Sequence, residues 1–438
     1  MKLRAYQTRT VTEVLQALRN GARGVLIQAP CGAGKTEIAI ELARQLNKRW
    51  TVVVPNSILA TQTERRLREC GLPAVRYGIA DEAVSQAERI NVATIQMLLE
   101  RDAEKKLRPD YICFDEAHHY EAEAWADFAA RYPEALRIGM TATPERFDGK
   151  SLLRHFDHLV IGATYAELIA AGVLVSARIY APAVSAPRGL AMDPLEAWRR
   201  FSEGRRTILA CGFIKEAQRY AEKFNRHFGA FGVRAACVDG DTPRSLNYAV
   251  LDDFREGKIQ VLTNVYYVAE GFDLPEIGCV VFARRFEFRG TYVQFGGRAL
   301  RAAPNKLDAI GIDLTGCSRH GHIHGDYPWT IAEQDKPGRQ NRTGDGEGDG
   351  RERKPLGVTN EGLVRVAHGA LGPSDPDPAP VVSSKQMRQR TASKRLLDEW
   401  GRIEQNARKM AGAKGAAAAR FWAEREKKRC IRLSPPTL

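Results

Sequence analysis

Residues 28–40, QAPCGAGKTEIAI, combine glycines, a lysine and a threonine at the spacing of a phosphate-binding loop. Gly32 and Gly34 allow backbone N–H groups to approach an anion closely. Lys35 offers a charge to the β- and γ-phosphates, and the Thr36 hydroxyl is a suitable ligand for Mg²⁺. A glycine-rich turn with no ligand is the alternative. We expect this segment to bind a nucleoside triphosphate, with ATP and Mg²⁺ as the cofactors.

Two adjacent carboxylates end the apolar run YICFD at residues 111–115. In a parallel sheet the carboxyl ends of the strands face the ligand, so Asp115 is expected beside the phosphates. Asp115 then suits Mg²⁺, and Glu116 suits the orientation and deprotonation of an attacking water. An ordinary acidic helix start is the alternative explanation of this pair.

The hydroxyls of Thr141 and Thr143 follow another apolar run, in the segment MTATP. They are placed to link events at the phosphates to a neighbouring domain, although Thr-Ala-Thr alone is a common tripeptide.

Polar residues that suit phosphoryl transfer also occur in the second half of the chain. Asp273 lies in a loop after a strand, in the segment EGFD. In QFGGRALR, spacings of four and three predict that Gln294, Arg298 and Arg301 share one helical face. Such a face suits the negative charge of a transferring γ-phosphoryl group. A surface salt-bridge helix is the alternative, but this turn has no acids.

Alternating strand and helix patterns must position these residues. Residues 1–165 contain five strand-like runs separated by helical stretches, which indicates a parallel α/β sheet. A second series of similar size begins near residue 176. We therefore predict two α/β domains, at residues 1–170 and 171–330.

The composition changes beyond residue 330. Residues 331–384 are rich in Gly, Pro and charge, which predicts a disordered linker. Residues 385–438 predict a basic helical tail, with 15 Lys/Arg against five Asp/Glu between Lys385 and Arg432, in a chain of net charge +13. A polyanionic partner is the natural inference, while a solvated basic helix or a docking site for a protein partner are the alternatives. Its aromatic residues either pack on the body or stack on bases.

The overall composition, 44% hydrophobic and 27% charged, is typical of a globular protein. No apolar run approaches the ~18 residues of a membrane span, and the N-terminus lacks a secretory pattern. We expect a cytoplasmic protein with no membrane contact. The eight cysteines form no C-x-x-C pair, which favours free thiols. A metal site at Cys317, His320, His322 and His324 is the less favoured alternative because its spacing fits no standard zinc pattern.

The order AxxxxGKT, DEAH, TATP, TNxxxxxEGFD and QxxGRxxR resembles motifs I, II, III, V and VI of superfamily 2 helicases and translocases. PNSIL (55–59), ATIQ (93–96) and TILACGFIKEAQRYA (207–221) resemble further motifs of the family. The resemblance covers about residues 1–325, with the bacterial and phage DEAD/DEAH-box group that includes RadD-like repair helicases as the most similar subgroup. Ala29 replaces the first glycine of motif I, which relatives tolerate. The resemblance implies two tandem RecA-like domains with an ATP cleft between them.

The resemblance also implies roles for single residues. Gln7 would contact the adenine, Asp273 the ribose, and His118 would connect the site to the second domain. Arg298 or Arg301 would act as the arginine finger. Together with the residues above, it implies the catalytic set Asp115, Glu116, Gln294, Arg298 and Arg301.

The predicted function is that of an ATP-dependent helicase that moves along and unwinds nucleic acid in phage or bacterial replication or repair. DNA is favoured over RNA as the partner because residue 118 is histidine and not aspartate. A duplex DNA translocase that never separates strands and an RNA helicase are the alternatives. A non-enzymatic clamp and a small-molecule kinase fit less well, since the hydrolytic residues and the second-domain arginines are both present.

Overall fold

The computed structural model describes residues 2–79, 88–100, 107–118, 123–144, 152, 155–183, 189–265, 274–327 and 363–366. These residues form two compact units. Unit 1 contains the described residues up to Leu174 together with Gly325 to Tyr327. Unit 2 contains those from Val175 to His324 together with residues 363–366.

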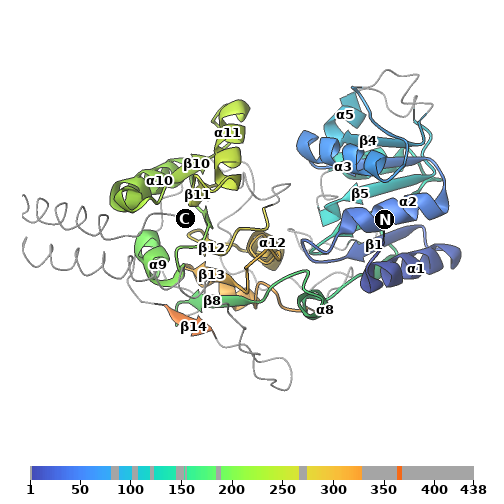
Figure 1. Cartoon of the computed structure of the whole chain (residues 1–438). Helices are drawn as coiled ribbons and strands as arrows, with labels where there is room; N and C mark the ends of the chain where they lie inside the picture. Colours follow the sequence, from blue (N-terminus) through green and yellow to red (C-terminus); the bar gives the residue numbers. More distant parts are fainter. Residues whose placement is uncertain are drawn as a thin grey trace, which may run out of the picture. The chain divides into compact units, whose positions relative to one another are not determined.

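The strands and helices of unit 1 alternate along the chain (Figure 1). Its described strands are β1 (Gly24–Gln28), β2 (Trp50–Val54), β3 (Ala74–Arg76), β4 (Ile90–Thr94), β5 (Tyr111–Asp115), β6 (Leu136–Thr141) and β7 (His158–Ile161). Its described helices are α1 (Ala5–Arg19), α2 (Lys35–Leu46), α3 (Ser57–Glu69), α5 (Ile95–Glu100), α7 (Glu123–Ala130) and α8 (Tyr165–Ala170).

The strands of unit 1 form one parallel sheet in the order β3-β4-β2-β5-β6-β1-β7. Strands β1, β2 and β4 are buried at every position, as expected of strands covered on both faces. Apolar residues of α1, α2 and α3 pack on one face, and residues of α5 and α7 pack on the other. The sequence identified five of these strands correctly.

Unit 2 repeats this organisation. Its described strands are β8 (Ala177–Ala181), β9 (Thr207–Ala210), β10 (Ala235–Val238), β11 (Val261–Asn264), β12 (Cys279–Phe282), β13 (Ala309–Asp313) and β14 (Val364–Val366). Its described helices are α9 (Pro194–Phe201), α10 (Ile214–Phe228), α11 (Arg244–Arg255) and α12 (Arg289–Gly297), with short 3-10 turns η2 (Gly229–Phe231) and η3 (Cys317–His320).

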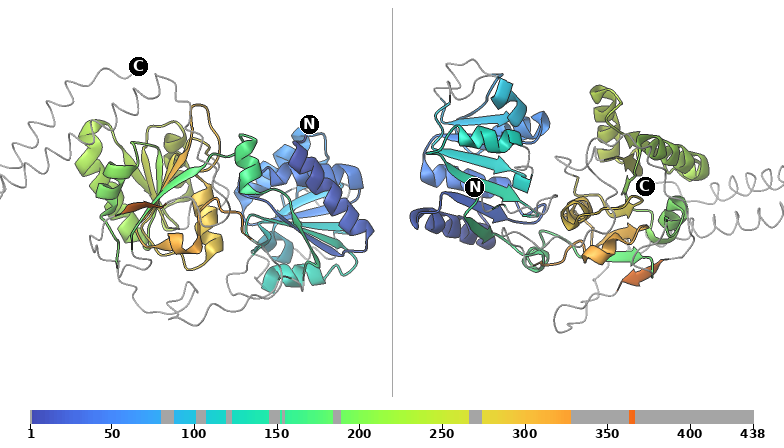
Figure 2. Two further views of the ribbon diagram at one scale, coloured as in Figure 1. Left: turned by 90° about the horizontal axis from the view of Figure 1, so that it is seen from below. Right: turned by 180° about the vertical axis from the view of Figure 1, so that it is seen from behind.

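The sheet of unit 2 has the order β10-β11-β9-β12-β13-β8-β14 and is parallel except for β14. Helices α9 and α10 pack on one face through a core that includes Trp198 and Phe224. Phe282 of β12 packs instead against Tyr292 and Phe295 of α12, which places α12 on the opposite face (Figure 2). Both units are therefore parallel-sheet α/β domains, which confirms the fold class predicted from the sequence.

One part of the predicted linker is a strand. Residues 331–384 were expected to be disordered, yet Val364–Val366 pairs antiparallel with β8, with Arg365 opposite Tyr180. Two β-branched residues flank this arginine, and they supply the local β preference that the composition of the whole segment hides. The rest of the linker and the tail at 385–438 lie outside the described residues.

Candidate nucleotide-binding and hydrolysis site

The phosphate-binding loop joins β1 to α2, as the sequence predicted. Gly34 is the residue before α2 and has a left-handed backbone (φ +76°), as does Gly32 (φ +86°). A side chain at Gly34 would place its Cβ 2.5 Å from Nε2 of Gln7. The backbone angle therefore favours glycine at position 34, and an added Cβ would displace the Gln7 amide from the loop. The arrangement leaves the positive end of a 12-residue helix at the loop.

Two residues of α1 hold this loop. Gln7, which is only 3% exposed, donates from Nε2 to the carbonyl of Ala33 at 3.2 Å. The Tyr6 hydroxyl donates to the same carbonyl at 2.8 Å. Gln7 thus lies beside the phosphate-binding loop, while the contact made by Tyr6 was not predicted. The only feature of the sequence that pointed to this contact is that a tyrosine, Tyr6, directly precedes Gln7.

The acidic pair lies at the carboxyl end of β5, as predicted. Glu116 is the residue after β5 and has a left-handed backbone (φ +52°), which is uncommon outside glycine. Its N–H donates to Oδ1 of Asp115 at 3.1 Å. Strained non-glycine residues of this kind are concentrated at functional sites.

Lys35 and Glu116 lie close together, although 81 positions of sequence numbering separate them. The Lys35 Nζ is 3.8 Å from Oε1 of Glu116 and donates to the Ala29 carbonyl at 3.4 Å. The side chains of Lys35 and Glu116 are 10% and 19% exposed. The site therefore combines a cation for phosphate oxygens with a carboxylate that can accept a proton from water.

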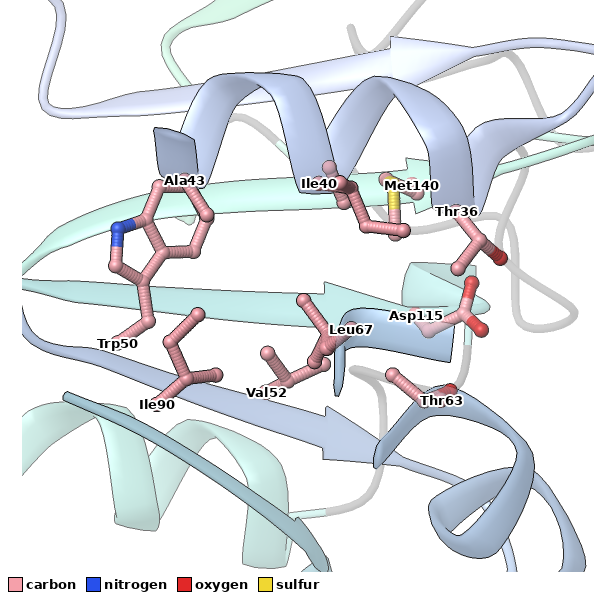
Figure 3. A pocket seen from close by; sticks show the side chains of 11 residues that line it. Thr36, Ile40, Ala43, Trp50, Val52, Thr63, Leu67, Ile90, Asp115 and Met140 are labelled. Carbon is pink, nitrogen blue, oxygen red and sulfur yellow. The ribbon is translucent and has the colours of Figure 1, made fainter. Parts of the chain in front are cut away.

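Thr36 and Asp115 line one end of a pocket between α2, α3 and the sheet (Figure 3). Thr63 of α3 also lines the pocket near Asp115, and apolar residues that include Ile40 and Trp50 line the rest of it. A hydroxyl and a carboxylate are oxygen donors, which Mg²⁺ prefers. These two residues fit the predicted metal, because they come from the phosphate-binding loop and from the acidic strand end.

His118 and Thr141 form a second polar contact at this edge of the sheet. His118 is 1% exposed, and its Nδ1 lies 3.1 Å from the Thr141 hydroxyl and 3.5 Å from Oε2 of Glu116. The Thr141 hydroxyl donates its own proton to the Thr143 carbonyl at 3.0 Å. The tautomer of His118 decides whether Nδ1 donates to the Thr141 hydroxyl or accepts from it. The predicted coupling residues are thus hydrogen-bonded to one another.

The second-unit residues lie partly as predicted. Gln294 and Arg298 are 9% and 7% exposed, which excludes a surface salt-bridge helix for these two. The helical position expected for Arg301 is wrong, because α12 ends at Gly297 and tight turns follow it. A Cβ at Gly296 would lie 2.6 Å from Ile323, so this glycine allows α12 to pack closely against Ile323. Asp273 lies outside the described residues.

The cysteines in the described residues are free, as expected. In that part of the chain, no group of three or more His, Cys, Asp or Glu side chains could hold a metal ion. Cys317 is buried, with its Sγ 3.1 Å from the Thr315 hydroxyl. The Cys317 thiol therefore has a hydrogen-bonding partner within the protein. None of the described helices has the length and apolar character needed to cross a membrane.

Two family models match the chain. Residues 1–146 match the model described as type III restriction enzyme, res subunit, and residues 193–303 match the helicase conserved C-terminal domain. A 51.5 kDa protein of Lactococcus phage (isolate 7-9) is 24% identical over 327 residues, which cover 69% of this chain and 68% of the phage protein. The DNA 3'-5' translocase XPB2 of Sulfurisphaera tokodaii is 31% identical over 150 residues, which cover 34% of this chain and 33% of the translocase.

The ATP-dependent type ISP restriction-modification enzyme LlaBIII, solved bound to DNA, shares the fold. Its TM-score is 0.55 at 19% identity, and the match covers 72% of this chain and 28% of the enzyme. The chain thus spans about a third or less of the length of this enzyme and of the translocase. The two family models are consistent with the motifs identified in the sequence, and the likeness to LlaBIII concerns the fold alone.

Proposed function

Because this chain belongs to superfamily 2 of the helicases and translocases, we propose that it couples ATP hydrolysis to movement along DNA and to strand separation. The observation that carries this proposal is the convergence of Lys35 and Thr36 with Asp115 and Glu116 at one sheet edge. A role in phage or bacterial replication or repair is part of the proposal, and the similarity to a protein of a Lactococcus phage supports the phage setting alone.

In the proposed reaction, Glu116 accepts a proton from the water that attacks the γ-phosphate. In the structure its carboxylate faces the Lys35 ammonium. Phosphate oxygens compete for that ammonium when a nucleotide binds, which leaves the carboxylate available to water. Mg²⁺, held by Thr36 and Asp115, would neutralise developing phosphate charge. Gln7 would read the adenine.

We propose that the arginines of unit 2, Arg298 or Arg301, supply the further positive charge that hydrolysis needs. Nucleic acid that binds both units would favour the hydrolytic state, and hydrolysis would release it. The expected behaviour is a low ATPase rate alone and a higher rate with polynucleotide. His118 and Thr141 would transmit this change from the nucleotide site.

Translocation on duplex DNA without strand separation is the second candidate. The similarity to a protein named a DNA translocase favours it. Strand displacement of a tailed duplex, measured beside ATP hydrolysis under the same conditions, separates the two. Displacement that needs ATP and is lost in Glu116→Gln supports the helicase, whereas duplex-stimulated hydrolysis without displacement supports the translocase.

A further inference from the structure

Lys306 lies in the segment between α12 and β13 and is only partly exposed. Its ammonium donates to three backbone carbonyls, those of Pro275 at 2.8 Å, Ile277 at 2.6 Å and Arg301 at 2.7 Å. An ammonium has three N–H donors and no acceptor, so all three are used. One side chain therefore connects two backbone segments that are far apart in sequence.

Burying the charged ammonium of Lys306 at this position costs desolvation free energy. Burial, together with the charges of Arg205 and Arg301, lowers the pKa of Lys306, although Glu276 and Asp308 oppose that shift. The three carbonyl oxygens that accept from the nitrogen favour its protonated form. An apolar side chain of similar length would fill the same space without this desolvation cost. The three short hydrogen bonds to backbone carbonyls offset this cost, because the ammonium uses all of its donors in them. A lysine at position 306 therefore indicates that its hydrogen bonds between the two backbone segments are important for the protein.

The two connected segments carry proposed functional residues. Pro275 and Ile277 come two and four residues after Asp273 in sequence and lead into β12. Arg301 lies beyond the end of α12, so no helical hydrogen bond fixes its backbone. The Leu300 carbonyl next to it accepts from Val175 N at 2.7 Å, and the Lys306 ammonium holds the following carbonyl.

We propose that Lys306 is a positioning residue that holds the Arg301 backbone against the segment following Asp273 and so aims the Arg301 guanidinium for hydrolysis. This inference rests on the proposed function, because it assigns Arg301 a part in ATP turnover. A misplacement of about 1 Å can reduce turnover by about a hundredfold, so a backbone cross-link of this kind has a measurable effect.

The test is a double-mutant cycle in the full-length chain, with polynucleotide-stimulated ATP turnover as the readout. Lys306→Met keeps the length of the side chain and removes all three donors. Arg301→Lys keeps a charge and removes the planar fork. Lys258→Met is the matched control, because Lys258 is a surface lysine of the same unit with a side chain that is 61% exposed. Lys306→Arg tests whether a cation restores function, and thermal midpoints report folding.

We expect Lys306→Met to lower the stimulated kcat roughly tenfold or more, with the KM for ATP changed by less than about twofold. Lys306→Arg should recover part of the loss, and Lys258→Met should resemble the parent. The double variant should be no slower than the slower single variant, because both changes disrupt one element.

Two results would overturn the inference in distinguishable ways. If Arg301→Lys is slow while Lys306→Met is unaffected, or if the two losses multiply, Lys306 does not act through Arg301 and the proposed function stands. If polynucleotide fails to stimulate the parent, or Arg301→Lys turns over normally, the proposed role of Arg301 fails and the inference fails with it.

Discussion

The Lys35 ammonium lies 3.8 Å from the Glu116 carboxylate, within a site where Lys35 and Glu116 come from different elements. This contact balances the charge of a partly buried lysine in the absence of phosphate. It also keeps the proposed general base occupied until a nucleotide competes for the lysine. Substitutions of Glu116 and of Lys35 should therefore have different effects on ATP binding and turnover.

Glu116→Gln should abolish turnover and retain ATP binding, because the amide keeps the shape of the side chain but accepts no proton. General-base catalysis contributes about 10²- to 10⁴-fold, so kcat should fall by at least about a hundredfold. Steady-state kinetics and fluorescent-nucleotide binding measure both quantities. Glu134→Gln is the matched control, since its side chain is 95% exposed. Loss of binding equal to the loss of turnover would contradict a base role.

Gly34→Ala should weaken ATP binding, because the new Cβ would lie 2.5 Å from Gln7 Nε2 and displace that amide from the loop, at a φ of +76°. Gly172→Ala is the control, since Gly172 has a φ of +65° with nothing within 4 Å of an added Cβ. It should lower stability by roughly 1 kcal/mol through the backbone alone and leave ATP binding intact. Equal effects of the two variants on ATP binding would contradict the account of position 34.

Thr141→Val removes the hydroxyl that bridges His118 and Thr143 while preserving side-chain volume. The proposed coupling predicts a larger fall in polynucleotide-stimulated turnover than in the rate without polynucleotide. Paired measurements of the two rates provide the check. If both rates fall by the same factor, the contact supports the site itself and does not couple it to nucleic acid.

Acid stability should depend on Glu203, which bridges Arg178 at 2.8 Å and Arg205 at 2.7 Å. Burial raises the pKa of Glu203, but the hydrogen bond from Arg178 and the charges of both arginines lower it to about 2. A carboxyl with a lowered pKa stabilises the fold above its unfolded value of about 4.3, and the contribution is lost as the pH falls through about 2.

Glu203→Gln should therefore lower the thermal midpoint at pH 7, by the equivalent of about 2 kcal/mol at most. The difference from the parent should shrink as the pH falls below about 4. Glu256→Gln, on a glutamate whose side chain is 59% exposed, is the control. A difference that stays constant from pH 7 to pH 3 would show that packing, and not the charge, is responsible.

The sequence predicted the residues whose positions follow from strand ends. Lys35, Thr36 and Asp115 lie at the carboxyl edge of a parallel sheet, so their convergence follows from the alternation of strands and helices. Arg301 could not be placed in this way. Helical spacing put it on α12, whereas that helix ends at Gly297, and spacing alone does not encode where a helix ends.

Other features depended on tertiary contacts between distant segments. The role inferred for Lys306 depends on three carbonyls, which any residue type can offer. The short edge strands β7 and β14 have too few residues to show a recognisable alternation of apolar and polar residues. Their formation depends instead on pairing with β1 and β8. Side-chain chemistry was thus more predictable than the backbone contacts that position it.

The central claim is tested most directly by ATP hydrolysis at fixed moderate salt with no polymer, single-stranded DNA, duplex DNA or RNA. The intact chain, Lys35→Ala and a truncation before Lys385 are compared. We predict that one form of DNA stimulates the intact chain and that Lys35→Ala abolishes turnover. The truncation should reduce the apparent affinity for DNA more than the maximal rate. A rate that no polymer changes in any of the three proteins would contradict the account.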